Sequence, residues 1–94
     1  LKAIEEDAPF GDLTTYPNPT RDLLNVDINV YMEGCVEVAV MNMLGQEARP
    51  TTTLTVATGA NRTTIDVSDL RAGTYFIRLT AGDKVVTQQF VKMD

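Results

Sequence analysis

The fold is decided by two stretches near the end of the chain, IDVSDLRAGTYFIRL at residues 65–79 and AGDKVVTQQFVK at residues 81–92. In the first, every second residue from Tyr75 to Leu79 is apolar and alternates with the opposite face, which is the pattern of a strand. In the second, a small polar turn at 81–83 leads into another strand over 84–92. These stretches therefore predict two strands joined by a hairpin.

A corner precedes the two strands. Residues 63–67 predict a strand, and residues 68–72 predict a single helical turn. Ser68 is the expected N-cap of that turn, and Gly73 is expected to end it in a left-handed conformation. We expect Leu70 to close the open end of the core.

Upstream of the corner, short apolar or β-branched segments are separated by residues that favour turns. Gly45 is expected to adopt a positive φ in one of these turns. About seven short strands at this spacing, without a sustained helical period, predict an all-β antiparallel sandwich. Strands are predicted over 24–30, 35–41, 46–49 and 52–57, with turns at 33–34 and 42–46 and a loop at 59–62.

The start of the chain differs from the rest. Residues 1–15 mix charged residues with Pro and Gly and show no period, so they predict a linker from a preceding domain, with the folded domain over 16–94. Because the chain begins with Leu1, we expect it to be a piece of a longer protein. Pro17 and Pro19 predict a stiff, extended lead-in at a sheet edge or just before a strand. Asp22 is expected to cap the following turn.

Composition limits the classes of function. The 94 residues suffice for one domain, and the formal net charge of −5 argues against binding nucleic acid or anionic lipid. No apolar run approaches the roughly 20 residues of a transmembrane helix. The absence of His removes the commonest catalytic base and metal ligand. We therefore expect no enzyme activity, no cofactor and no metal.

Three further features can be interpreted either as ordinary structural features or as functional sites. Cys35 is interpreted as a small apolar side chain on a strand rather than a reactive thiol. The acidic run at residues 5–7 is interpreted as solvated linker rather than a metal site. Asn25, Asp27 and Asn29 share one strand face, which we interpret as a wet surface rather than a cation site.

From Tyr16 to the end, the chain resembles the type A C-terminal sorting domains of the type IX secretion system of Bacteroidota. The likeness rests on four blocks in order: an opening proline block, a mid-domain Gly, a Gly-Thr-Tyr corner and a last strand that ends in an apolar pair and Lys. Departures are Asp83 between Gly82 and Lys84, a Gln88-Gln89 pair, and two residues after Lys92. The matching residues are Tyr16, Pro17, Asn18, Pro19, Asp22, Gly45, Leu70, Gly73, Thr74, Tyr75, Phe90, Val91 and Lys92.

The resemblance implies an Ig-like sandwich that serves as a sorting signal. It implies a secreted or cell-surface cargo that reaches the periplasm by a signal peptide, and shuttle proteins and an outer-membrane translocon as partners. It also implies removal of the domain by a sortase-like surface peptidase, with a cut in or before residues 1–15. On this basis we expect the last strand to carry the recognition, through Lys84, Phe90, Val91 and Lys92. The corner residues Gly45, Gly73, Thr74 and Tyr75 would hold that strand in place or serve folding alone.

Two other classes fit the sequence. The stretch from Leu70 to Tyr75 is similar to the tyrosine corner of fibronectin type III domains, which favours a spacer or carbohydrate-binding module of a secreted enzyme. Such domains usually have an early Trp, and none is present here. An inhibitory pro-domain is the third class.

Overall fold

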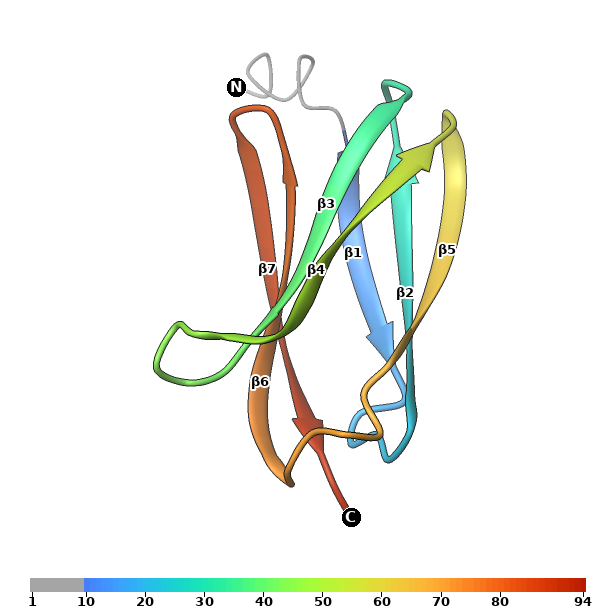
Figure 1. The fold of residues 1–94 in the computed structure, drawn as a ribbon. Coiled ribbons are helices and arrows are strands. Elements are labelled where there is room, and N and C mark those ends of the chain that lie inside the picture. Colours follow the sequence, from blue (N-terminus) through green and yellow to red (C-terminus); the bar gives the residue numbers. More distant parts are fainter. Residues whose placement is uncertain (1–9) are drawn as a thin grey trace, which may run out of the picture.

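The computed structural model describes residues 10–94, which form seven strands in two antiparallel sheets packed face to face (Figure 1). One sheet has the order β1-β2-β5 and the other has the order β4-β3-β6-β7. This arrangement confirms the predicted all-β, Ig-like sandwich. The strands are β1 (Phe10–Tyr16), β2 (Leu23–Val30), β3 (Gly34–Met41), β4 (Glu47–Val56), β5 (Gly59–Asp66), β6 (Gly73–Ala81) and β7 (Lys84–Lys92).

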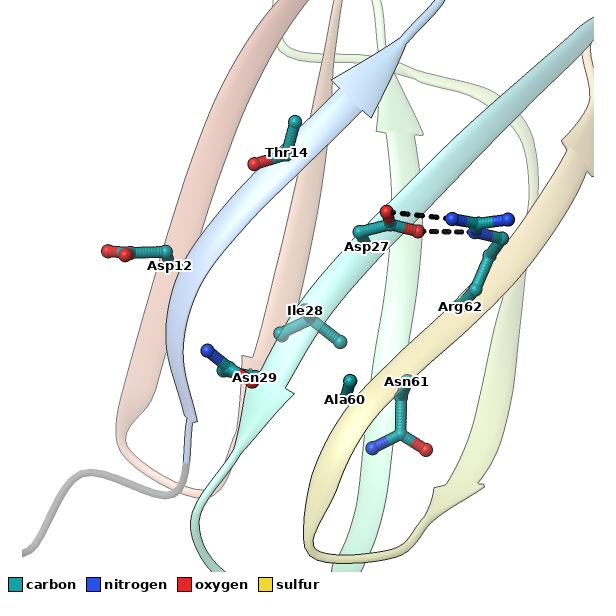
Figure 2. A pocket seen from close by; sticks show the side chains of 8 residues that line it. All are labelled: Asp12, Thr14, Asp27, Ile28, Asn29, Ala60, Asn61 and Arg62. Atoms are coloured by element: carbon teal, nitrogen blue, oxygen red, sulfur yellow. Dashed lines mark hydrogen bonds and ion pairs between the residues drawn. The ribbon is translucent and has the colours of Figure 1, made fainter.

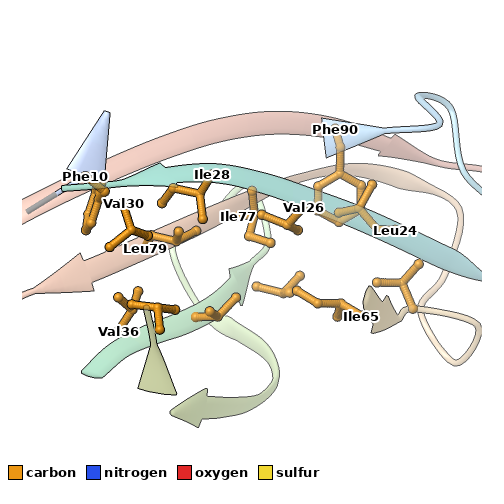
Figure 3. Close-up of a cluster of buried hydrophobic side chains, with 14 residues drawn as sticks. Phe10, Leu24, Val26, Ile28, Val30, Val36, Ile65, Ile77, Leu79 and Phe90 are labelled. Carbon is orange, nitrogen blue, oxygen red and sulfur yellow. The ribbon is translucent and has the colours of Figure 1, made fainter. Parts of the chain in front are cut away.

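The core lies between the two sheets and is built from alternate residues of the strands (Figure 3). In β2 and β3 the inward residues are those that the two-residue period predicted. Full burial of each aliphatic side chain contributes about 1.5–3 kcal/mol, which makes this cluster the main source of stability. The cluster comprises Phe10, Leu24, Val26, Ile28, Val30, Val36, Val38, Val40, Val56, Ile65, Val67, Ile77, Leu79 and Phe90.

The linker prediction was wrong for residues 10–15, because they belong to β1 and pair with β2. Phe10 is buried and anchors the start of the strand. The register shifts between Phe10 and Leu13, around Gly11, which hid the two-residue period in the sequence. The rest of the predicted linker, with the acidic run at residues 5–7, lies outside the described residues.

Two boundaries in the middle of the chain also differ from the prediction. Residues 46–49 and 52–57 were expected as separate strands, but β4 runs through Pro50. Proline is tolerated there because β4 is an edge strand and its pairing with β3 is irregular. The loop expected at residues 59–62 is instead the start of β5, which pairs without a break along β2.

The corner after β5 is a turn and not a helix. The Ser68 N–H and hydroxyl both donate to Asp66 Oδ1, at 2.9 and 2.6 Å, so Asp66 is the capping residue and Ser68 is not. These two bonds, the hydroxyl first, lower the pKa of Asp66. Gly73 has a φ of 158° and begins β6 in nearly extended backbone, which corrects the expected left-handed conformation. Leu70 packs against the end of the core, as predicted.

The final hairpin has its predicted form. Gly82 and Asp83 make the turn, Ala81 pairs with Lys84, and β7 ends at Lys92. The sequence left open which face of β7 is buried. In the structure, the even-numbered residues face the core and Phe90 is fully buried.

Candidate functional site

Two sequence blocks far apart in the chain meet at the end of the sandwich where the C-terminus lies (Figure 1). The Val91 N–H donates to Asn18 Oδ1 at 2.9 Å, and the Thr20 N–H donates to the Val91 carbonyl at 2.9 Å. The Met93 N–H donates to the Thr20 carbonyl at 2.8 Å, and Arg21 donates to the backbone carbonyl of Asp94. We call this set of hydrogen bonds the tail clasp.

The clasp is anchored to the opposite sheet by Thr20 and Asp22. Thr20 is 1 % exposed, its backbone bridges β7 beside Lys92, and its hydroxyl donates to the Leu23 carbonyl. The Asp22 carbonyl accepts a hydrogen bond of 2.8 Å from the Val67 N–H. Asp22 therefore acts through its backbone and not as the predicted side-chain cap. The clasp joins β7 of one sheet to the β1–β2 connection of the other.

Pro17 and Pro19 flank Asn18 in this connection. Both X-Pro peptide bonds, Tyr16-Pro17 and Asn18-Pro19, are cis. The expected extended lead-in is wrong, because β1 ends at Tyr16 and the chain bends over residues 17–19 before Thr20 meets β7. A local pattern could not show this, since the partner of the bend lies at the other end of the sequence.

The Gly-Thr-Tyr block lies on the other side of the tail. Gly73, Thr74 and Tyr75 pair with Lys92, Val91 and Phe90 in turn. The Tyr75 ring stacks on the Phe90 ring, with centroids 5.8 Å apart, and its hydroxyl donates to the Arg71 carbonyl at 2.8 Å. Residues 90–92 are thus held between the β6 corner and the tail clasp.

The residues expected to carry recognition do not form one exposed cluster. Phe90 is 0 % exposed and Lys92 is 5 % exposed, with Lys92 Nζ donating to the Met93 carbonyl at 2.9 Å. Val91 is half-buried within the clasp, and Lys84 lies at the opposite end of β7. Both of these side chains pack within the end of the sandwich.

One backbone edge of β7 points away from its partner strand β6. Val91 directs both its N–H and its carbonyl toward the clasp. Backbone groups alternate along a strand, so Val85, Thr87 and Gln89 direct theirs to the same side. Among residues 10–94 no strand pairs with that side, because β7 is the outermost strand of its sheet. The clasp covers the last part of this edge, and β1 of the opposite sheet also lies close to β7. We call the part over residues 85–89 the open edge, because no strand within residues 10–94 pairs with it.

The outer face of the three-stranded sheet carries the second concentration of polar groups (Figure 2). Arg62 donates twice to Asp27, at 2.7 and 3.2 Å, and Tyr16 donates to Asp27 at 3.1 Å. The hydrogen bonds from Arg62 lower the pKa of Asp27 and raise that of Arg62. Partial burial, then the bond to Asp27, raises the pKa of Tyr16.

A shallow groove of about 430 Å³ opens beside this ion pair, lined by residues from β1, β2 and β5. Two carboxylates, Asp12 and Asp27, line the groove, and Asp27 is already paired with Arg62. On the same strand as Asp27, Asn25 accepts from the Thr64 hydroxyl at 2.9 Å. Within residues 10–94 no three His, Cys, Asp or Glu side chains gather as metal ligands. Arg62 lies 5.5 Å from the Tyr16 ring centroid, so that face is covered and cannot stack on a sugar. The polar face is best explained as a solvated surface.

Gly45 and Cys35 are two further residues for which the sequence predicted a conformation or a place. Gly45 has the predicted positive φ, 81°, but lies in the β3–β4 turn away from the tail. Cys35 lies on β3 as expected, although it is exposed and not buried. Thr20 and Arg21 were not predicted to bind the tail, since nothing in their local pattern sets them apart.

The chain matches the family model described as the secretion system C-terminal sorting domain over residues 14–93. The curated proteins contain no match to this chain. Residues 10–94 include no helix of the length and apolarity that crossing a membrane requires. The family is one of sorting signals on secreted or cell-surface proteins, not of enzymes. The matched region covers the proline block, the Gly-Thr-Tyr corner and the tail strand that meet in the structure, and the chain belongs to the family of C-terminal sorting domains of the type IX secretion system.

Proposed function

We propose that this domain directs a preceding cargo from the periplasm across the outer membrane, and that a partner reads it through the open edge of β7. The partners would be the shuttle proteins and translocon of the type IX system. The observation that supports this proposal best is the convergence of the three family blocks around the tail, between the clasp and the β6 corner.

The mode of recognition follows from the chemistry of a strand edge. Unpaired N–H and carbonyl groups can accept a partner strand, which gives affinity through main-chain hydrogen bonds. The open stretch over residues 85–89 offers such groups from Val85, Thr87 and Gln89. The clasp and Tyr75 would keep that edge straight and in place, so that the motif residues act by positioning and not by contact.

The cargo would be cut away on the N-terminal side of Phe10. Residues 10–16 are paired with β2, and Phe10 is buried, so this segment is a poor protease substrate. A sortase-like surface peptidase would therefore cut before β1, within or ahead of residues 1–9. N-terminal sequencing of the released domain tests this: a cleavage bond between residues 11 and 16 would contradict it.

Proline substitution tests recognition through the edge. The N–H of Thr87 faces away from β6, so Thr87→Pro removes an outward donor and leaves the ladder with β6 intact. Thr87→Ala is the matched control. In a reporter that carries a signal peptide and residues 1–94, we expect Thr87→Ala to be exported and Thr87→Pro to stay in the periplasm, with both folded by circular dichroism.

A photo-crosslinking side chain at position 87 supplies a second measurement that needs no proline. We expect crosslinks to a protein of the export machinery from position 87 and none from position 37, which lies on the central strand β3. Normal export of a folded Thr87→Pro domain, together with no crosslink from position 87, would show that the β7 edge is not read.

A further inference from the structure

The β3–β4 turn, residues 42–46, projects from the side of the sandwich (Figure 1). It carries two adjacent apolar side chains that are exposed. Met43 is 63 % exposed and Leu44 is 81 % exposed. These are the highest values for large apolar side chains in residues 10–94. Isolated exposed apolar residues are ordinary on a protein surface, but neighbouring ones at the tip of a projecting turn form a small patch.

The turn is closed by hydrogen bonds that centre on Asn42. Asn42 Oδ1 accepts hydrogen bonds from the N–H groups of Leu44, at 2.8 Å, and Gln46, at 3.0 Å. Asn42 Nδ2 donates to Gln46 Oε1 at 3.0 Å, and the Gly45 N–H donates to the Asn42 carbonyl at 3.0 Å. A preorganised loop loses little conformational entropy on binding, which favours its use as a contact.

Gly45 contributes to this turn through its backbone. Its φ of 81° is one that side chains rarely adopt, and a Cβ there would meet no atom within 4 Å. The residue is therefore required for the conformation of the turn and not for packing. This explains why a residue of the family pattern lies away from the tail: it fixes the tip that presents Met43 and Leu44.

We propose that Met43 and Leu44 form an apolar anchor that inserts into an apolar pocket on a protein of the export machinery. This inference rests on the proposed sorting function and adds a second contact, separate from the β7 edge. A few central side chains that fill pockets on the partner carry most of the binding energy of an interface, and methionine is enriched among interface residues.

Charge and size favour a protein pocket over the alternatives. Residues 41–48 contain Glu47 and neither Lys nor Arg, and the chain carries a net charge of −5, so an anionic lipid surface would repel the tip. Two apolar side chains also provide little area for insertion into a bilayer. A second copy of the chain would need about 800 Å² of contact per partner, and a projecting turn of five residues does not offer that.

Tyr31 and Met32 form another exposed apolar pair, which differs from Met43 and Leu44 because one of its members already has a contact within the domain. Tyr31 and Met32 follow β2, but Tyr31 lies against Gly11, where an added Cβ would be 2.2 Å from the Tyr31 hydroxyl oxygen. Its aromatic ring therefore already has a partner within the domain. Met32, 54 % exposed, is a matched control for an exposed methionine that is not on the tip.

The test uses the signal-peptide reporter fused to residues 1–94 in a type IX-competent host. Because both anchor side chains are exposed, the double variant M43S/L44S should fold with an unchanged unfolding midpoint. We expect its surface delivery to fall at least about tenfold, as loss of a buried apolar anchor would cause. M32S and the exchanged variant M43L/L44M should be delivered normally. A photo-crosslinker at position 44 should capture a protein of the export machinery.

The outcomes separate this inference from the function on which it rests. If the unsubstituted reporter is not delivered, the sorting function fails and the anchor fails with it. If the unsubstituted reporter and M43S/L44S are delivered equally, only the anchor is wrong. Crosslinks from position 44 to lipid alone, or to a second copy alone, would also overturn it.

Discussion

Asn18 and Val91 are 73 residues apart in sequence, yet the Asn18 side-chain carbonyl accepts a 2.9 Å hydrogen bond from the Val91 N–H. This bond joins the proline block at the start of the domain to the strand that ends it. Thr20 adds two backbone hydrogen bonds on either side of Lys92, because its N–H donates to the Val91 carbonyl and its carbonyl accepts from the Met93 N–H. The end of β7 is therefore held by the β1–β2 connection, which joins two strands of the opposite sheet.

Loss of the Asn18 acceptor should loosen the tail. A hydrogen bond of this kind contributes about 0.5–1.5 kcal/mol, so we expect Asn18→Ala to lower the free energy of unfolding by about 1 kcal/mol. Asn18→Asp keeps an acceptor oxygen and should lose less. Urea unfolding gives the free energies, and hydrogen exchange should show faster exchange of the Val91 amide in Asn18→Ala. Unchanged protection of that amide would mean that Asn18 does not hold the tail.

Tyr75 stabilises the other side of the tail in two separable ways. Tyr75→Phe removes the hydrogen bond to the Arg71 carbonyl but keeps the ring against Phe90, so we expect a loss of about 1 kcal/mol. Tyr75→Ala removes the ring as well and should cost about 3 kcal/mol or more. Equal losses in the two variants, measured by urea unfolding, would show that the ring stacking contributes nothing.

Phe90 and Lys92 face the same way, but their substitution should have different consequences. Phe90→Ala leaves a cavity in the core and should cost about 3–5 kcal/mol. A domain of this size has a free energy of unfolding of only roughly 5–14 kcal/mol, so we expect a clear fall of the thermal unfolding midpoint of Phe90→Ala, measured by circular dichroism. An unchanged midpoint would show that Phe90 does not support the core.

Lys92→Met tests whether the ammonium group of this buried lysine matters. Methionine fills the space of the lysine stem, and the lost group makes one hydrogen bond, to the Met93 carbonyl. We expect the free energy of unfolding to change by less than about 1 kcal/mol. A large loss of stability, measured by urea unfolding, would show that the charge is required within the fold.

The ion pair on the outer face predicts a pH dependence. The pKa of Asp27 in the folded state lies below its ordinary value of 3.8, because Arg62 donates to the carboxylate. Its contribution to stability is therefore complete above that value and is lost as the pH falls through the lower, folded-state pKa. Asp27→Asn and Arg62→Gln should each reduce the fall of the unfolding midpoint below about pH 4. The pair is exposed, so salt should weaken the effect.

The result that would contradict this account is a pH profile of Asp27→Asn that coincides with that of the unsubstituted domain. In Asp27→Asn and Arg62→Gln, part of the fall of the unfolding midpoint at low pH should remain, because Ser68 lowers the pKa of Asp66 in the folded state. The two carboxylates can therefore be separated by comparing the profiles of Asp27→Asn and the double variant D27N/D66N.

Alternation of side chains predicted β2, β3 and β6, because these strands bury one face and leave the other in water. The strand β7 was predicted from its place after the hairpin turn, and its weak alternation left the buried face open. Alternation failed for β1, where Gly11 and the register shift interrupt the period. It also failed for the start of β5, where Gly59 and Asn61 favour a turn locally but pair with β2 in the fold. Pairing partners override local preference at such positions.

The tail clasp could not be predicted from local patterns at all. Its bonds join residues 18–21 to residues 91–94, and Thr20 looks like an ordinary turn residue in sequence. The family resemblance identified both blocks but not their contact. It also suggested Phe90 and Lys92 as recognition residues, and the structure buries both side chains.

The central claim is that this domain is a sorting signal whose tail is read by the type IX system. The most direct measurement is the surface delivery of a reporter that carries a signal peptide and residues 1–94, in a type IX-competent host and in the same host without the translocon. We predict surface delivery in the first and periplasmic retention in the second. Equal delivery in both hosts, or retention in both, would contradict the claim.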